Sequence, residues 1–206
     1  MEARDARKHS KLARCAAVGL LCLTRAFAAG ADSGVSHEYE IKAAFLFNFT
    51  RFIEWPSFSF ADAASPIVIG VIGTDPFGGA LASIVQGRRV NGRPIVARYV
   101  TRDEEARATH LLFVGLTKEE DIARLMRALS GYPVTTVGES PAFAAQGGTI
   151  TFVLQGDKVR FEINAAAAAQ THVRISAQLE KLATVVRRTL PAEGGACCAT
   201  FRSGEN

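Results

Sequence analysis

The feature that most constrains the fold of this chain is a pattern that occurs four times: a short apolar segment, followed by residues typical of the start of a helix. The first run, 67–72, is continuously apolar, which is typical of a strand buried on both faces. We predict three further strands at 95–100, 110–114 and 134–137. Strands that alternate with helices form a parallel sheet, and right-handed crossovers place the helices on its faces.

The helices between these strands are predicted from their first residues. A helix is expected over 77–86, after the turn Thr74-Asp75-Pro76. Thr101 and Thr117 begin segments with capping-box spacing, the second of which opens a helix that reaches Ser130. Ser140-Pro141 predicts an N-cap followed by proline at the first helical position.

An aromatic helix is predicted over 38–55, ahead of the first strand, with Pro56 as its end. Its stripe includes Phe45, Phe49 and Phe52 at helical spacing. Such a density of phenylalanine indicates core packing. The alternative is a surface aromatic patch for a partner.

The end of the chain follows another pattern. The segments 149–154 and 158–163 flank a Gly-Asp pair, which predicts an antiparallel hairpin. Asn164 is expected to cap a long helix that runs to about Leu190. We therefore expect an α/β fold, a single three-layer domain with a mostly parallel sheet, a C-terminal antiparallel hairpin and a long C-terminal helix. This domain is expected to span 38–190, with a flexible tail over 191–206.

Residues 1–28 have the order of features of a secretory signal peptide: a basic start, the apolar run 15–23, and the small-x-small triplet 26–28. The apolar run is too short to cross a bilayer. The full chain has 24 basic and 20 acidic residues, but 1–28 holds six of the first and two of the second. The exported chain is therefore formally neutral, which excludes the basic surface of a nucleic-acid-binding protein.

Candidate sites for chemistry are few. Ligands of open α/β sheets bind beyond the carboxyl ends of the strands, so Asp75, Phe77 and Glu139 are candidates for a small-ligand pocket. The chain has no GxGxxG, Walker A, HExxH, CxxC or GxSxG motif. We therefore expect no catalytic residues, no metal site and no cofactor, and we predict that the protein is not an enzyme.

The aromatic helix also supplies candidates for partner binding. Phe47, Arg51 and Trp55 offer the aromatic and arginine side chains that dominate binding energy at interfaces. From the residues alone, the chain is an exported α/β binding domain.

The segment 40–56, EIKAAFLFNFTRFIEWP, closely resembles the opening helix of the YfiR family of periplasmic proteins. The resemblance continues in the same order through IGVIGTDPFG at 69–78, HLLF at 110–113 and VRFEIN at 159–164. It covers about 39–187, nearly the whole exported chain.

This resemblance implies a periplasmic regulator that binds the periplasmic part of an inner-membrane diguanylate cyclase of the YfiN type and holds it inactive. Cyclic di-GMP, which favours attachment and biofilm, is thereby lowered. The resemblance also implies a homodimer, and a YfiB-like outer-membrane lipoprotein that draws the inhibitor away. The alternative is a periplasmic small-molecule sensor or carrier coupled to another envelope signalling protein.

The chain departs from the family pattern in its cysteines. Members often carry Cys before the histidine of the third strand, where this chain has Thr109. Only Cys197 and Cys198 remain after removal of 1–28, so the core disulfides of some relatives cannot form.

Overall fold

The structure is a computed structural model that describes residues 33–187. The signal peptide predicted at 1–28 and the tail at 191–206, with Cys197 and Cys198, lie outside these residues. The chain divides into two compact units, 1–38 and 39–206, and the second holds the sheet. Within 33–187, no helix has both the length and the apolar character that a membrane span requires.

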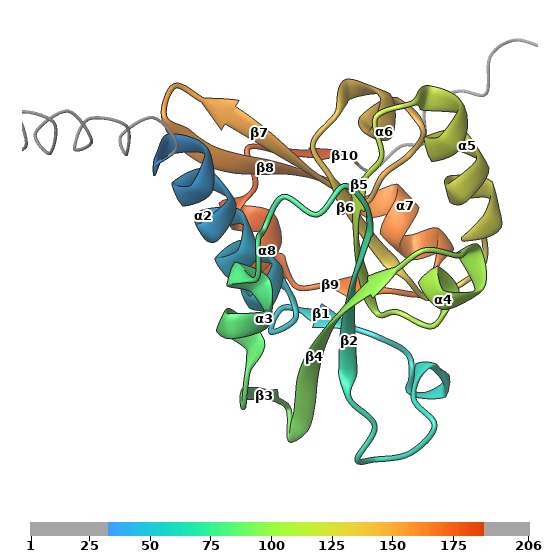
Figure 1. Cartoon of the computed structure of the whole chain (residues 1–206). Helices are drawn as coiled ribbons and strands as arrows, with labels where there is room; N and C mark the ends of the chain where they lie inside the picture. The colour runs from blue at the N-terminus through green and yellow to red at the C-terminus, as the bar shows by residue number, and fades with distance from the viewer. Residues whose placement is uncertain (1–32, 188–206) are drawn as a thin grey trace, which may run out of the picture. The chain divides into compact units, whose positions relative to one another are not determined.

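A central sheet of four parallel strands confirms the main prediction (Figure 1). Their spatial order is β4-β2-β5-β6, and each pair of neighbours is parallel. The strands are β2 (Ile67–Gly73), β4 (Arg93–Val100), β5 (Leu111–Gly115) and β6 (Thr135–Gly138).

Further strands extend this sheet to eight on both sides. The predicted hairpin is present as β7 (Ile150–Gln155), parallel to β6, and β8 (Lys158–Asn164), antiparallel to β7. At one edge of the sheet, β10 (Val185–Arg187) pairs in parallel with β8. At the other edge, β3 (Arg89–Val90) pairs antiparallel with β4. A separate two-stranded sheet pairs β1 (Ile53–Glu54) with β9 (Arg174–Ile175).

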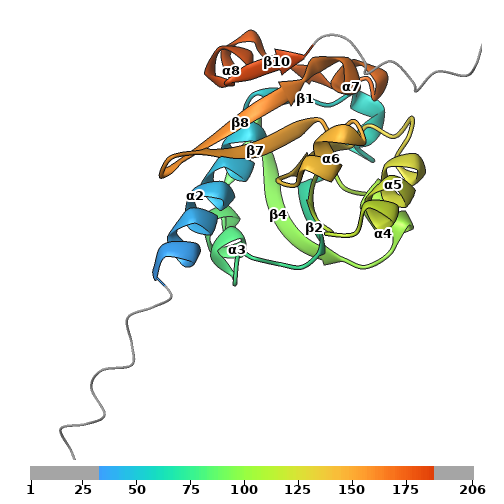
Figure 2. The same cartoon turned by 90° about the horizontal axis from the view of Figure 1, so that it is seen from above.

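Helices cover both faces of the sheet (Figure 2). One hydrophobic cluster contains side chains of α2 (Ser33–Phe49), α3 (Ala80–Val85) and α8 (Ala177–Leu182). The other contains side chains of α4 (Asp103–Arg107), α5 (Glu119–Ala128) and α6 (Pro141–Ala145). The mixed α/β fold with a mostly parallel sheet is therefore confirmed.

The aromatic helix is shorter at its end than predicted, because α2 stops at Phe49 rather than at Trp55. The Thr50 hydroxyl donates to the Phe47 carbonyl at 2.6 Å and so competes with the helical hydrogen bonds. Beyond this turn the chain forms β1, whose Ile53 pairs with Ile175 of β9. Strand pairing with a distant segment thus replaces the last helical turn.

The prediction of a long C-terminal helix is wrong. The Asn164 side chain does cap a helix, since it accepts the backbone N–H of Ala167 at 3.1 Å, but that helix is the short α7 (Ala165–Gln170). His172 then adopts a φ of 58°, in the left-handed region that ends helices. The chain continues as β9, α8 and β10, and Ser176 caps α8 by accepting the N–H of Leu179.

Other helix starts differ in detail. α3 begins at Ala80 rather than Phe77, because Gly79 has a φ of 92°. The residues that cap α4 and α5 are Arg102 and Lys118, neither of which makes a side-chain capping bond, so the capping boxes predicted from Thr101 and Thr117 are wrong. The Ser140 cap is confirmed by its bond from the N–H of Phe143.

Candidate functional site

The three residues predicted to bind a partner lie in three different environments around the end of α2. Phe47 is buried, with the Arg88 guanidinium carbon 4.8 Å from its ring centre. Arg51 is exposed in the turn that follows the helix. Trp55 follows β1, is half-buried, and donates its indole N–H to the His110 carbonyl at 2.8 Å. Arg51 alone of the three presents a freely accessible side chain.

Trp55 belongs to a cluster built around His110. The Phe60 ring stacks on the imidazole at 4.4 Å, and the Arg93 guanidinium carbon lies 3.8 Å from the Phe60 ring centre. The imidazole Nδ1 accepts the N–H of Val68 at 3.1 Å, which leaves the hydrogen of the neutral ring on Nε2.

Burial lowers the pKa of His110 to about 4, and the positive charge of Arg93 acts in the same direction, while the Ser59 carbonyl opposes them. The ring is therefore neutral near pH 7. Its geometry is that of a structural histidine, because its Nδ1 and the Trp55 indole tie the start of β5 to β2 and to the segment after β1.

The segment that follows β1 exposes an aromatic ring that the sequence did not single out. Phe58 is 70% exposed and its ring makes an edge contact with His172 at 6.4 Å. Antiparallel pairing of β1 with β9 sets Glu54 opposite Arg174 in the same region. We call the residues Arg51, Glu54, Trp55 and Phe58 the 51–58 segment.

The residues predicted for a ligand pocket at the carboxyl ends of the strands are engaged in local structure. The Asp75 carboxylate accepts the N–H of Phe77 at 2.8 Å and fixes a turn. Phe77 is buried between Tyr39 and Phe113, with ring centres at 6.0 and 4.8 Å.

Glu139, the third residue of that prediction, is bonded to α2. Its carboxylate accepts the Lys42 ammonium at 2.5 Å and the Tyr39 hydroxyl at 3.1 Å. Asp75 and Phe77 border a hollow of about 130 Å³ between β2, β4 and α3, and Glu139 does not line it.

The crevice where β2 and β5 end is closed by direct backbone contact. The order β4-β2-β5 makes this the topological switch point, at which open α/β sheets ordinarily bind ligands. The Thr74 N–H donates to the Gly115 carbonyl at 3.1 Å. A Cβ at Gly115 would lie 2.2 Å from the Thr74 carbonyl oxygen, so only glycine permits this approach.

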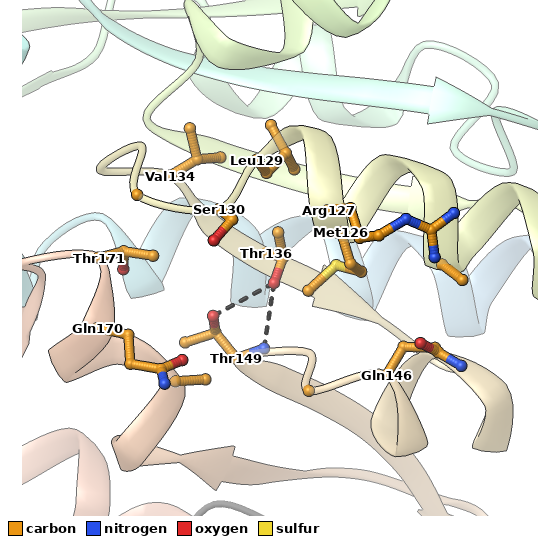
Figure 3. Close-up of a pocket in the computed structure, with 14 residues that line it drawn as sticks. Met126, Arg127, Leu129, Ser130, Val134, Thr136, Gln146, Thr149, Gln170 and Thr171 are labelled. Carbon is orange, nitrogen blue, oxygen red and sulfur yellow. Dashed lines mark hydrogen bonds between the residues drawn. The ribbon is translucent and has the colours of Figure 1, made fainter. Parts of the chain in front are cut away.

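A larger cavity, of about 560 Å³, lies at the amino-terminal ends of β6 and β7 (Figure 3). Its lining comes from α5, the start of β6, the loop before β7, and α7. Sequence reasoning missed this cavity because four separate segments build it and no one of them carries a motif. Among residues 33–187, no group of three or more His, Cys, Asp or Glu side chains is placed to hold a metal ion.

Two solved structures are similar to this chain at low sequence identity. A conserved domain protein from Vibrio cholerae O1 biovar El Tor matches at 12% identity with a TM-score of 0.45, over 72% of this chain and 60% of that one. The ABC domain from Streptococcus pneumoniae in complex with L-Trp matches at 10% identity with a TM-score of 0.42, over 58% and 54%. The chain spans less than two thirds of either structure.

The sequence also matches a family model over residues 39–184, from the middle of α2 to the residue before β10. This range contains the whole parallel sheet, the hairpin and the 51–58 segment. By this match the chain belongs to the YfiR/HmsC-like family.

Proposed function

We propose that this protein is a periplasmic regulator that binds the periplasmic part of an inner-membrane diguanylate cyclase of the YfiN type and keeps the enzyme inactive. Lower cyclic di-GMP in the cytoplasm is the result. The observation that carries the proposal is the family match over 39–184. The leader-like order of residues 1–28 supports export by a cleaved signal peptide.

In this proposal, binding of the inhibitor is linked to the equilibrium between the active and inactive states of the cyclase. A binding protein inhibits only if its affinity for the inactive state of the cyclase exceeds its affinity for the active state. Removal of the inhibitor by a YfiB-like outer-membrane lipoprotein then releases the active state by competition. We propose that the inhibitor acts as a homodimer, as the family resemblance implies, and a two-fold dimer is the commonest symmetric assembly of soluble proteins.

We place the contact with the cyclase on the 51–58 segment and the end of α2. Arg51 and Phe58 are exposed and supply the arginine and aromatic side chains that anchor interfaces. Trp55 is held by its bond to His110, which fixes the shape of this surface, and Phe47 is buried in the hydrophobic cluster that contains α2. A preorganised surface loses less entropy on binding than a flexible one.

Direct binding tests this proposal. The exported chain, 29–206, is immobilised on a sensor, and its binding of the detergent-solubilised membrane cyclase of the same bacterium is measured by biolayer interferometry. We expect saturable binding, and about tenfold weaker binding for Arg51→Ala and for Phe58→Ser. Arg124→Ala, on α5, is the matched control and should bind as the wild type does.

Absence of binding by a correctly folded protein would contradict the proposal. Equal binding by all three variants, with the wild type bound, would leave the cyclase as partner but remove the 51–58 segment from the contact.

A further inference from the structure

The 560 Å³ cavity at the amino-terminal ends of β6 and β7 is large enough for a small molecule, since ligand sites are ordinarily about 300–1,000 Å³. It lies on the face of the sheet opposite α2. Thr136 lines it, whereas the next residue of β6, Val137, belongs to the cluster that contains α2. The cavity is therefore separate from the 51–58 segment and does not depend on the function proposed above.

The floor of the cavity carries a pair of threonine hydroxyls that together have one hydrogen left to donate. Thr136 and Thr149 are both 3% exposed, and their hydroxyl oxygens lie 3.2 Å apart. The Thr136 oxygen also accepts the backbone N–H of Thr149 at 3.1 Å (Figure 3). The two hydroxyls hold two hydrogens, and their mutual bond uses one.

Neither hydroxyl makes a further hydrogen bond to residues 33–187, so the second hydrogen is available to an acceptor in the cavity. An oxygen acceptor of a bound molecule can take this hydrogen in place of water. The floor thus favours an occupant with oxygen acceptors.

The walls carry side chains that both donate and accept. Gln146 lies on the wall formed by α6 and its loop, Gln170 on the wall formed by α7, and Ser130 follows α5. Figure 3 shows the two glutamines on different sides of the threonine pair. Amide and hydroxyl groups in this arrangement match the hydroxyl groups of a polyol from several directions.

The charges around the cavity favour a neutral occupant. No carboxylate lines the cavity, and Arg127 is its one charged lining residue. The helices α5 and α7 both approach the cavity with their C-terminal ends, whose carbonyls carry partial negative charge although several of them accept hydrogen bonds. The positive charge of Arg127 and the partial negative charge of these carbonyls have opposite effects on a charged ligand. The cavity therefore favours neither an anion nor a cation.

The remaining lining is aliphatic, from Leu129, Val134 and Ala167, with Met126 beside them. A sugar ring has an apolar face of C–H groups and a rim of hydroxyl groups, and this cavity offers a partner to each. We propose that the cavity binds a neutral polyhydroxylated small molecule of the saccharide class, with the Thr136 and Thr149 hydroxyls as its central hydrogen-bonding pair.

The test is an NMR titration of the ¹⁵N-labelled exported chain, 29–206, with three neutral probes: glucose, N-acetylglucosamine and mannitol. We expect at least one probe to give saturable shifts at the amides of Thr136, Thr149, Gln146 and Gln170. Sodium gluconate and lysine serve as charged probes of similar size, and we expect weaker binding of both.

Variants then locate the site. Thr136→Val removes a floor hydroxyl and should weaken binding about tenfold, because one hydrogen bond to the ligand is lost and its partner is left unpaired. Gln170→Ala changes an exposed wall residue and should weaken binding without affecting folding. Thr135→Val is the matched control, since its buried hydroxyl is on the adjacent residue of β6 and lies outside the lining.

Three results would overturn the proposal: no saturable shift with any neutral probe, shifts that map away from the cavity, or preferred binding of a charged probe. Wild-type affinity in both Thr136→Val and Gln170→Ala would do the same.

Discussion

The two faces of the sheet are packed by different means. On the face covered by α2, six phenylalanines are buried, and we call this the aromatic face: Phe47, Phe49, Phe77, Phe113, Phe152 and Phe161. On the face covered by α4, α5 and α6, the aliphatic face, Phe143 is the one buried aromatic residue of the cluster. The 560 Å³ cavity lies beside the aliphatic face, and none of the six phenylalanines lines it.

This difference follows from how each face is covered. The continuous helix α2 lays a row of rings over β7 and β8, and Phe49 touches Phe152 and Phe161 at 5.9 and 5.0 Å. The aromatic face also carries two six-residue helices, α3 and α8, but the longest helix on the aliphatic face, α5, has ten residues against the seventeen of α2. The cavity lies where α5 ends. The comparison teaches that the aromatic face stabilises the domain, and that the aliphatic face has room for a ligand.

The largest expected effect separates two phenylalanines that are equally buried. Phe49→Ala should lower the free energy of unfolding by about 4 kcal/mol, and Phe143→Ala by about 3 kcal/mol, because Phe49 also loses its contacts with three other rings. Urea unfolding followed by the fluorescence of Trp55, the one tryptophan, measures both. A larger loss for Phe143→Ala would contradict the contrast between the faces.

Close packing on the aliphatic face is tested by adding an atom. A Cβ at Gly148 would lie 2.2 Å from the Phe143 ring, and one at Gly138 would lie 2.6 Å from it. Gly148→Ala should therefore destabilise the fold by roughly 1–3 kcal/mol. In the background of Phe143→Leu the same substitution should cost less, because the ring that it meets is gone. Additive effects in this double-mutant cycle would argue against the contact.

An ion pair on each side of the sheet gives the next comparison. Lys42 is 3% exposed and bonds to Glu139, whereas the Arg124 side chain is 57% exposed and bonds to Asp103 at 3.1 Å. Lys42→Met should cost about 2 kcal/mol, because the loss leaves the Glu139 carboxylate without its cation. Arg124→Met should change stability by less than about 0.5 kcal/mol. Equal changes in the unfolding free energy of the two variants, measured in urea, would contradict a stabilising role of the Lys42–Glu139 pair.

The last comparison concerns the pH dependence of stability that His110 adds. Its pKa in the folded protein is about 4, below the ordinary 6.5, so folding favours the neutral ring. The stability contributed by this preference is complete above pH 6.5 and is lost as pH falls toward 4. His110→Asn keeps an acceptor for the Val68 N–H but does not titrate. Its unfolding free energy should fall less steeply than that of the wild type over this interval, and parallel curves would refute the assignment.

Much of the parallel sheet was predictable, because a strand buried on both faces must be apolar throughout, as 67–72 is. The hairpin was predictable from its turn residues. The two-stranded sheet was not, since Ile53 and Ile175 pair across most of the domain and neither segment has a strand pattern of its own. Tertiary pairing also explains why the predicted C-terminal helix is interrupted. Residues 185–187 pair with β8 as strand β10, and the helix propensity of the sequence does not take this pairing into account.

The candidate site was predictable only in outline. Arg51 is exposed, and its role in partner binding stays a prediction, whereas nothing in the sequence distinguishes the exposed Phe58 from the buried phenylalanines near it. Asp75 and Glu139 follow strands as expected, yet each is bonded to a group whose position depends on the folded chain. The cavity lined by Thr136 and Thr149 depends on where α5 and α7 end in the folded chain, and no local sequence pattern specifies this.

The most direct test of the central claim is the intracellular concentration of cyclic di-GMP in a strain that lacks this gene. The strain is complemented with the full chain or with one that lacks residues 1–28. We predict a rise on deletion that the full chain reverses and the leaderless chain does not. An unchanged concentration in every strain, with the protein shown to be expressed and exported, would contradict regulation of a cyclase from the periplasm.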